Sequence, residues 1–121
     1  MSNDRFKFRV WDKDEQHYLL EGSLLDGRTG KIAGYFDDYT FSVEQCTGLK
    51  DKNGKLIFEN DVVSDMGIEA IVDWYYDSYM IEYDDGSISE LAIAAEALEV
   101  IGNVHDEQFR DLTKMVEKER N

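Results

Sequence analysis

The stretch "TGLKDKNGKLIFENDVV", residues 47–63, decides the fold of this 121-residue chain. It holds Gly48, the pair Asn53-Gly54 and Asn60, which are residues that readily reverse a backbone, with strand-forming apolar residues between them. The sequence "DKNGK" is compatible with two turn types. One is a two-residue type I′ turn at Asn53-Gly54, and the other is a type I turn that begins at the aspartate and ends with Gly54 in the left-handed conformation. Either turn returns the chain as a strand, and Asn60 tolerates the positive φ of a second reversal. We expect these residues to be structural.

Strand periodicity dominates the residues before this stretch. In "RFKFRVW", the apolar residues Phe6, Phe8 and Val10 face one way, whereas Lys7 and Arg9 face the other. The charged turn "DKDEQ" and the strand "HYLLEG" at 17–22 complete a predicted N-terminal hairpin. "LLDGRTGKIAGYF" at 24–36 indicates a turn and a strand, and "YTFSVEQC" at 39–46 alternates again with its aromatic and branched residues on one face.

The residues after this stretch predict a three-stranded meander over 68–91. On its first strand one face carries Ile68, Ala70, Val72 and Trp74, and the opposite face carries Glu69 and Asp73. On its second strand we expect Tyr79, Ile81 and Tyr83 inward, and Met80, Glu82 and Asp84 outward. A tight turn is predicted at Asp85-Gly86. The alanines of 90–99 favour one or two helical turns, and "LEVIGNV" at 98–104 is a short closing strand.

A helix is predicted over 105–121. Asp106 is placed to cap its N-terminus, and basic residues gather near its C-terminus, as the helix dipole prefers. Its expected apolar stripe consists of Phe109, Leu112, Met115 and Val116.

The charge is strongly asymmetric along the chain. The net charge is −14, from 27 acidic and 13 basic residues. Residues 56–109 contain fourteen acids and no Lys or Arg, and the rest of the chain is balanced. Such a surface repels a phosphate backbone, so we expect no direct nucleic-acid binding. A basic protein partner, or solubility alone, accounts for it.

Acidic and aromatic residues of the meander form the candidate interaction surface. Tyrosines at a hairpin tip can anchor a protein partner, although cross-strand packing explains an aromatic cluster as well. Carboxylates on the outward faces of neighbouring strands can imitate a row of phosphates. The candidate residues are Glu69, Asp73, Tyr75, Tyr76, Glu82 and Asp84.

No motif for catalysis, cofactor binding or metal binding stands out. His17 and His105 have no ligand-spaced partners, and zinc requires three or four. Cys46 has no base placed beside it by the sequence, and a lone cysteine is commonly a small buried apolar residue. No apolar signal core precedes the first strand, and one cysteine fits a reducing cytoplasm. We expect no enzyme, no cofactor, no metal site and no membrane association.

Three segments together resemble the YopX family of small phage and prophage proteins. They are "FRVWDK" at 8–13, "QCTGLKDKNGKLIFENDVV" at 45–63 and "LEVIGNVHD" at 98–106, which span nearly the whole chain. The family commonly has Glu-Gly-Asp where this chain has Glu59-Asn60-Asp61, and an aromatic residue where Cys46 lies. The resemblance implies a β-rich fold whose central step is similar to the entry of SH3-like barrels. It supplies no catalytic residues.

These observations predict a mainly β (β-rich α+β) fold of meandering antiparallel sheets, with an SH3-like, partly open barrel in the second half and a C-terminal α-helix. We expect a single domain over 1–121, with N-terminal strands at 1–46, a barrel-like part at 47–104 and the helix at 105–121. The expected function is that of a non-enzymatic phage accessory protein acting through protein contacts in the host cytoplasm, with self-association as one form. The alternative is an acidic nucleic-acid mimic that blocks a basic cleft of a host protein.

Overall fold

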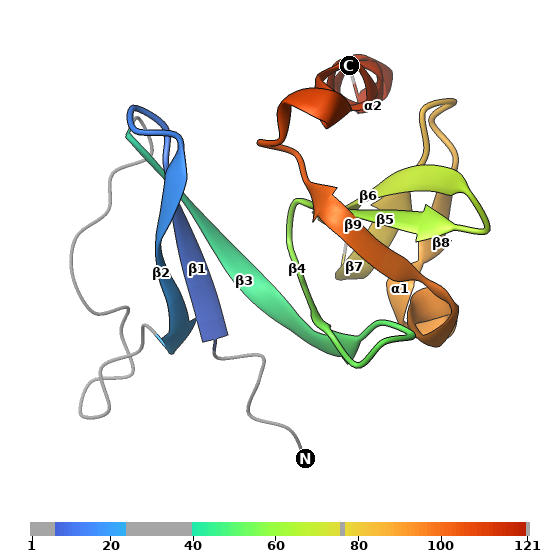
Figure 1. Ribbon diagram of the computed structural model, residues 1–121. Helices are drawn as coiled ribbons and strands as arrows, with labels where there is room; N and C mark the ends of the chain where they lie inside the picture. The colour runs from blue at the N-terminus through green and yellow to red at the C-terminus, as the bar shows by residue number, and fades with distance from the viewer. Residues whose placement is uncertain (1–6, 24–39, 76, 121) are drawn as a thin grey trace. The chain divides into compact units, whose positions relative to one another are not determined.

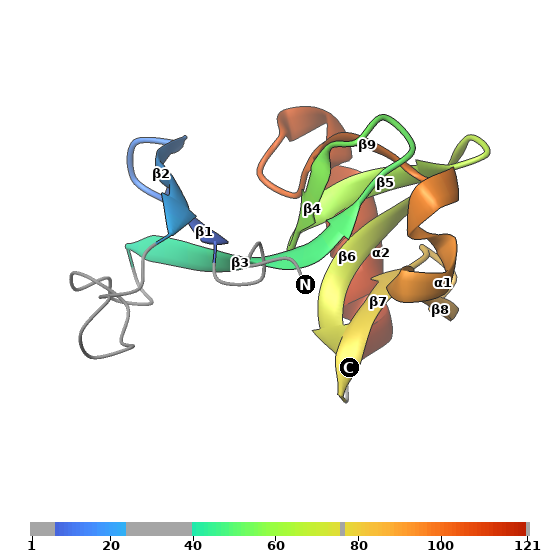
Figure 2. The same ribbon diagram turned by 90° about the horizontal axis from the view of Figure 1, so that it is seen from below.

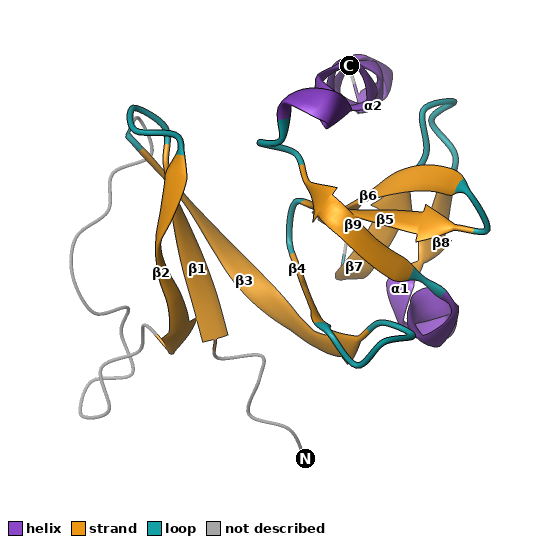
Figure 3. Cartoon of the chain, in the orientation of Figure 1, coloured by secondary structure: helices purple, strands orange, loops and turns teal. Residues whose placement is uncertain are grey.

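The computed structural model describes residues 7–23, 40–75 and 77–120. The chain is mainly β, with antiparallel sheets and a C-terminal helix, as the sequence predicts (Figures 1 and 3). The strands are β1 (Lys7–Asp12), β2 (His17–Ser23), β3 (Phe41–Lys50), β4 (Leu56–Phe58), β5 (Asp61–Asp65), β6 (Ile68–Tyr75), β7 (Ser78–Glu82), β8 (Ile88–Glu90) and β9 (Glu99–Asn103). The helices are α1 (Leu91–Ala94), the 3-10 turns η2 (Ala95–Ala97) and η3 (Glu107–Phe109), and α2 (Arg110–Arg120). Within the described ranges, none of the helices combines the length and apolar character that crossing a membrane requires.

The chain divides into two compact units, residues 1–48 and 49–121. Strand β3 runs through the boundary at Gly48, where φ is +83°. A glycine at position 48 suggests a strand that ends there in a sharp bend, but β3 continues through Gly48 to Lys50. The single domain over 1–121 remains a prediction.

The first sheet confirms the N-terminal hairpin. Its strand order is β2-β1-β3-β4. Strands β1 and β2 pair antiparallel from Lys7↔Ser23 to Asp12↔His17, and β1 pairs with β3 on its other side. Phe6, Tyr39 and the strand expected within 24–36 lie outside the described residues.

The second sheet confirms the meander and its closing strand. Its order is β8-β7-β6-β5-β9, so the last strand returns to pair with the first. The helical turns α1 and η2 lie between β8 and β9, where the sequence predicts one or two turns of helix. This order gives the partly open, SH3-like barrel of the second half of the chain.

The second sheet has an apolar cluster on each face, because neighbouring residues of a strand point to opposite sides. Leu91, Ala95 and Leu98, from α1 and the turns after it, cover one face, which contributes Val63, Ala70, Val72, Tyr79 and Ile81. Phe109 and Val116 cover the other face, where they contact Val62 and Ile71. Figure 2 shows α1 and α2 on opposite sides of β6 and β7.

The turn at "DKNGK" is the second of the two alternatives. Gly54 has φ +80°, whereas Asn53 is not in the positive-φ region. The Gly54 N–H donates to the Asp51 carbonyl at 3.0 Å, and the Asp51 N–H donates to the Lys55 carbonyl at 2.9 Å. The turn is therefore type I, with Gly54 in the left-handed position.

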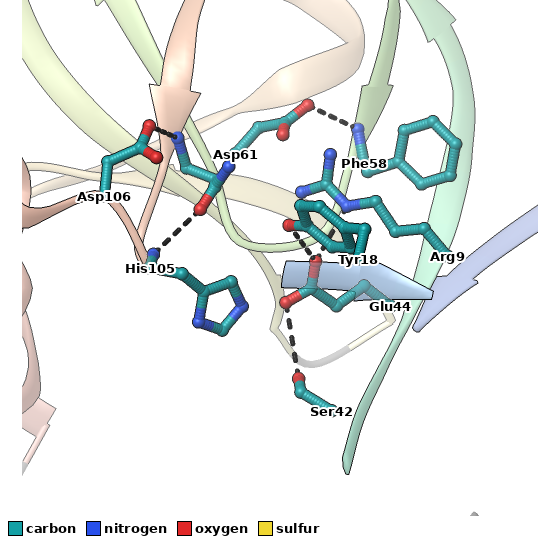
Figure 4. A network of polar contacts seen from close by, with 9 residues as sticks. Arg9, Tyr18, Ser42, Glu44, Phe58, Asp61, His105 and Asp106 are labelled. Carbon is teal, nitrogen blue, oxygen red and sulfur yellow. Dashed lines mark hydrogen bonds and ion pairs between the residues drawn. The ribbon is translucent and has the colours of Figure 1, made fainter. Parts of the chain in front are cut away.

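The other predicted reversals occur where the sequence places them. Asn60 has φ +68° and Gly86 has φ +87°. At Asn60 the N–H donates to the Val72 carbonyl at 2.8 Å, and the Asn60 carbonyl accepts from Val104 at 2.9 Å. The Asp61 carboxylate accepts the N–H of Phe58 at 2.8 Å, which closes the reversal from inside (Figure 4).

The C-terminal helix differs from its prediction in two ways. Asp106 does not cap it: its carboxylate instead accepts the N–H of Asn103 at 3.0 Å, because 3-10 turn η3 folds back on β9 (Figure 4). Phe109 and Val116 are buried and Leu112 is half-buried, as predicted, but Met115 is 49% exposed. The buried stripe runs through Phe109, Leu112 and Val116, at the i, i+3, i+7 spacing of one helix face. Met115 lies beside this stripe.

Candidate functional site

The four candidate carboxylates do not form one exposed row. The register pairs Ile71 with Glu82, and cross-strand partners point to the same side, so Glu69, Asp73 and Glu82 share a face as predicted. That face, however, is the one covered by α2 around Ile71. Glu82 is only 4% exposed, which contradicts the prediction that it points into solvent. The helical pattern gave no indication of which sheet face α2 would cover.

The remaining acids of this set differ in exposure. Glu69 and Asp84 are exposed. Asp73 is half-buried, and its carboxylate accepts the N–H of Trp74 at 2.8 Å. Two exposed carboxylates, Glu69 and Asp84, and the half-buried carboxylate of Asp73 therefore remain from the predicted row.

The aromatic cluster packs across strands, as its structural interpretation predicts. Trp74 and Tyr79 are register partners, and their rings meet edge to face with centroids 4.8 Å apart. Trp74 remains 46% exposed. Tyr75 is half-buried within β6, and Tyr76 lies outside the described residues. Tyr75 is therefore not a freely projecting anchor.

A shallow depression lies at the opposite end of β6, where β5 ends and β7 has just ended. Its volume is about 270 Å³, and it is lined by Asp65, Ile68, Tyr83, Asp84, Asp85 and Ser87. Ile68 is 59% exposed. The sequence analysis missed this depression because its residues are up to 22 positions apart and meet only through strand pairing.

Tyr83 is fixed within this depression by a hydrogen bond. Its hydroxyl donates to Asp65 Oδ2 at 2.9 Å. Burial of the hydroxyl, and then this bond to a carboxylate, raise the pKa of Tyr83 above its ordinary value of 10.0, although Ser89 acts in the opposite direction. The phenol is therefore protonated at neutral pH and holds its ring against the wall of the depression.

The turn beside the depression exposes a methionine. Met66 and Gly67 form a two-residue hairpin loop between β5 and β6, with φ values of +52° and +89°. The Gly67 N–H donates to Ser64 Oγ at 3.1 Å. Met66 is 95% exposed. The sequence pattern "DMG" indicates a turn at Gly67, and that turn is present, but the sequence analysis did not single out the apolar residue at its tip.

The first unit contains a buried polar network (Figure 4). Arg9 Nε donates to Glu44 Oε1 at 2.7 Å, and the hydroxyl of Tyr18 donates to the same oxygen at 2.9 Å. Ser42 Oγ donates to the other carboxylate oxygen at 3.3 Å, and the Arg9 guanidinium lies 4.7 Å from the centre of the Tyr18 ring. Arg9 is only 8% exposed, so the charged face of β1 is covered at this position. A buried arginine requires such a partner, so we interpret this network as structural.

The described residues provide little for catalysis. Cys46 is a free, fully buried thiol, and its sulfur accepts the N–H of Gly48 at 3.5 Å. This agrees with its interpretation as a small buried apolar residue. In the ranges that the structure describes, no group of three or more His, Cys, Asp or Glu side chains is arranged to hold a metal ion.

Comparisons with known proteins concern the family and the fold. A family model described as "YopX protein" matches residues 7–108. Among solved structures, the chain is similar to the crystal structure of protein EF1440 from Enterococcus faecalis, with 23% identity and a TM-score of 0.60. The match covers 84% of this chain and 94% of that one, and at this identity it supports the fold alone. None of the curated proteins matches.

Proposed function

The chain belongs to the YopX family, and we propose that it is a non-enzymatic phage or prophage accessory protein that acts through protein–protein contacts in the cytoplasm of the bacterial host. The family resemblance suggests the phage context. The nature of its surface suggests contacts as the mode of action.

The observation that carries the proposal is a set of exposed apolar side chains within the acidic segment 56–109. Met66 is 95% exposed, Ile93 is 82% exposed and Ile68 is 59% exposed. Scattered apolar side chains are ordinary on protein surfaces, but Met66 and Ile68 lie on one hairpin beside a depression. Burial of such apolar side chains against a partner lowers the free energy of the complex. The surrounding carboxylates favour a partner with a basic surface.

Self-association through the C-terminal helix is less well supported than a contact with a different protein. The apolar residues Phe109 and Val116 of this region already pack on Val62 and Ile71. Removing the chain from Asp106 onward would expose these two sheet residues, so truncation would test folding as well as association. Two copies with a net charge of −14 would also repel each other.

The experiment that tests the proposal is affinity capture of the tagged full chain from bacterial host lysate. The resin is washed at low and then at high salt, and retained proteins are identified by mass spectrometry. We expect a retained protein with a basic surface. Sedimentation of the purified chain distinguishes self-association. If the resin retains nothing above a tag-only control and the chain sediments as a monomer, the proposal fails.

Nucleic-acid mimicry is the second candidate. Its support is that Glu69 and Asp73 share one face of β6 and that Asp84 follows the neighbouring strand β7, all within a segment that contains no Lys or Arg. The burial of Glu82 shortens the row, so the test replaces only these three residues, as Glu69→Gln, Asp73→Asn and Asp84→Asn. A matched variant with the same charge change, Asp14→Asn, Glu96→Gln and Asp111→Asn, alters exposed acids elsewhere.

Mimicry predicts capture of a nucleic-acid-binding protein that is released by salt and is lost in the first triple variant but kept in the second. Equal capture by both triple variants would show that overall charge, and not the position of these carboxylates, attracts the partner.

A further inference from the structure

We propose that the depression beside β6, together with the exposed Met66, receives a Lys or Arg side chain of a partner protein with an adjoining apolar residue. We call this the hairpin-tip site, and its residues are Asp65, Met66, Ile68, Tyr83, Asp84 and Asp85. The inference rests on the proposed function, because it requires that the protein acts through protein contacts.

The size and the walls of the depression suit a side chain. Pockets for whole small molecules usually measure about 300–1,000 Å³ and are enclosed. This depression measures about 270 Å³ and is shallow. Ile68 and the fixed ring of Tyr83 provide apolar walls, against which the methylene groups of a long basic side chain can lie.

The charge at the rim selects a cation. Asp65 is engaged by the Tyr83 hydroxyl, and Asp85 accepts the N–H and the hydroxyl of Ser87 at 2.9 and 2.6 Å. Asp84 is exposed, and it makes no hydrogen bond or ion pair with the part of the chain that the structure describes. No Lys or Arg occurs in residues 56–109 to neutralise these carboxylates. An incoming ammonium or guanidinium therefore meets the exposed carboxylate of Asp84 and two further negative charges.

Met66 is a poor choice for the turn itself. Both residues of this two-residue loop have positive φ, and Asn-Gly or Asp-Gly sequences suit that geometry best. A methionine pays a conformational penalty in the left-handed region, and at 95% exposure it gains almost no burial in return. A flexible, polarisable side chain at an exposed tip is well adapted to cover an apolar residue of a partner.

The experiment is a selection of a random dodecapeptide library, displayed on particles, against the immobilised full-length protein. We expect selected peptides to carry Lys or Arg within two positions of a large apolar residue. The most enriched peptide is then synthesised, and its affinity is measured by fluorescence anisotropy for the wild type, for Met66→Asn and for Asp84→Asn.

The two variants have distinct expected effects. Met66→Asn should weaken peptide binding about tenfold, because it removes an exposed apolar anchor. It should at the same time raise the midpoint of thermal unfolding, since it creates the favoured Asn-Gly turn. Asp84→Asn should weaken binding about threefold at low salt and less at high salt, without changing thermal stability.

Matched controls lie outside the hairpin-tip site. Met115→Gln replaces another exposed apolar side chain, and Asp111→Asn removes another exposed charge. Both controls should bind the peptide as the wild type does. The proposal is overturned if the library yields no enriched peptide, if the enriched peptides lack basic residues, or if Met66→Asn and Asp84→Asn bind as tightly as the controls.

The failure of this site can be told apart from the failure of the proposed function. If Met66→Asn and Asp84→Asn still capture the wild-type set of lysate proteins, the protein acts through contacts elsewhere and only the hairpin-tip site is refuted. If the wild type captures nothing, the proposed function itself fails.

Discussion

Two hairpins of the second unit have the same backbone geometry but different environments. In the hairpin 51–55, the Gly54 N–H donates to Asp51 at 3.0 Å and the Asp51 N–H donates to Lys55 at 2.9 Å. In the hairpin 83–87, the Gly86 N–H donates to Tyr83 at 3.1 Å and the Tyr83 N–H donates to Ser87 at 2.9 Å. Each ends with a glycine in the left-handed conformation. A type I turn with this glycine is therefore used twice.

The side chain at the first position decides what each hairpin does. Asp51 is 5% exposed, and its carboxylate accepts the N–H groups of Asn53, Lys55 and Val100, each at 2.9 Å. It thus binds its own turn and also strand β9. Tyr83 instead points its hydroxyl to Asp65, and the acids after it remain at the surface. The first hairpin stabilises the fold, whereas the second leaves its charges available to a partner.

The largest expected effect separates Asp51 of the first hairpin from Asp85 of the second. Asp51→Ala should lower the free energy of unfolding by about 3 kcal/mol, because three N–H groups lose a charged acceptor. Asp85→Ala removes a carboxylate of the exposed hairpin that accepts only from Ser87, and it should cost only a small fraction of that loss. Urea unfolding followed by circular dichroism measures both. Equal losses for the two variants would contradict the distinction between the hairpins.

Acid should remove the contribution of Asp51. Burial acts to raise its pKa, but the N–H donors of Val100, Lys55 and Asn53 outweigh it and hold the pKa of Asp51 below its ordinary value of 3.8. A carboxylate with a depressed folded-state pKa stabilises fully above the unfolded value, and its contribution is lost as the pH falls below 3.8 through the folded value.

The difference in unfolding free energy between wild type and Asp51→Asn should therefore be constant from pH 7 to pH 5 and should shrink below pH 4, the point near which the unfolded carboxyl titrates. Urea titrations at several pH values measure this difference. A difference that stays constant down to pH 2 would show that the charge of Asp51 is not what stabilises the hairpin.

The two glycines test whether the hairpins share one geometry. Gly54 has φ +80° and no atom within 4 Å of where a Cβ would lie, so the cost of Gly54→Ala arises from the backbone alone. We expect Gly54→Ala and Gly86→Ala each to lower the free energy of unfolding by about 1 kcal/mol. Gly54→Asn should cost less, since asparagine tolerates this conformation. Clearly unequal costs of the two alanine variants would show that the turns differ in energy although they agree in hydrogen bonding.

The sequence predicted the elements of this fold well because their signals are local. The hairpin strands, the meander, the reversal at Asn60 and the terminal helix each depend on residues within a few positions of one another. The errors concern what covers each face. Glu82 alternates correctly along its strand, yet it is buried, and Arg9 on the charged side of its own strand is buried as well. Alternation distinguishes two faces but does not show that a second layer covers the polar one.

The candidate site was harder to predict for the same reason. The predicted acids were chosen by alternation within two strands, and the burial of Glu82 broke that row. The depression depends on the register that brings Asp65 opposite Ile68 and places Tyr83 nearby. No short sequence pattern carries that register. The exposed methionine was the available signal, because an apolar residue before a glycine in a tight turn contradicts the usual turn chemistry.

The smallest expected effect comes from a second link between hairpin 51–55 and the region of β9. Lys52 Nζ lies 3.4 Å from Glu99 Oε2, with the two side chains 49% and 44% exposed. Water and salt screen such a pair, so Lys52→Gln should change the free energy of unfolding by no more than about 0.5 kcal/mol, and the change should vanish at high salt. The backbone bond from Lys52 N–H to the Leu98 carbonyl at 2.9 Å remains in this variant.

Comparison with Asp51→Ala, by the same urea titration, therefore asks whether a buried carboxylate or a surface ion pair holds this hairpin to the sheet. A loss from Lys52→Gln as large as that from Asp51→Ala would move the stabilising contact to the surface, and the hairpin 51–55 would then resemble its exposed counterpart.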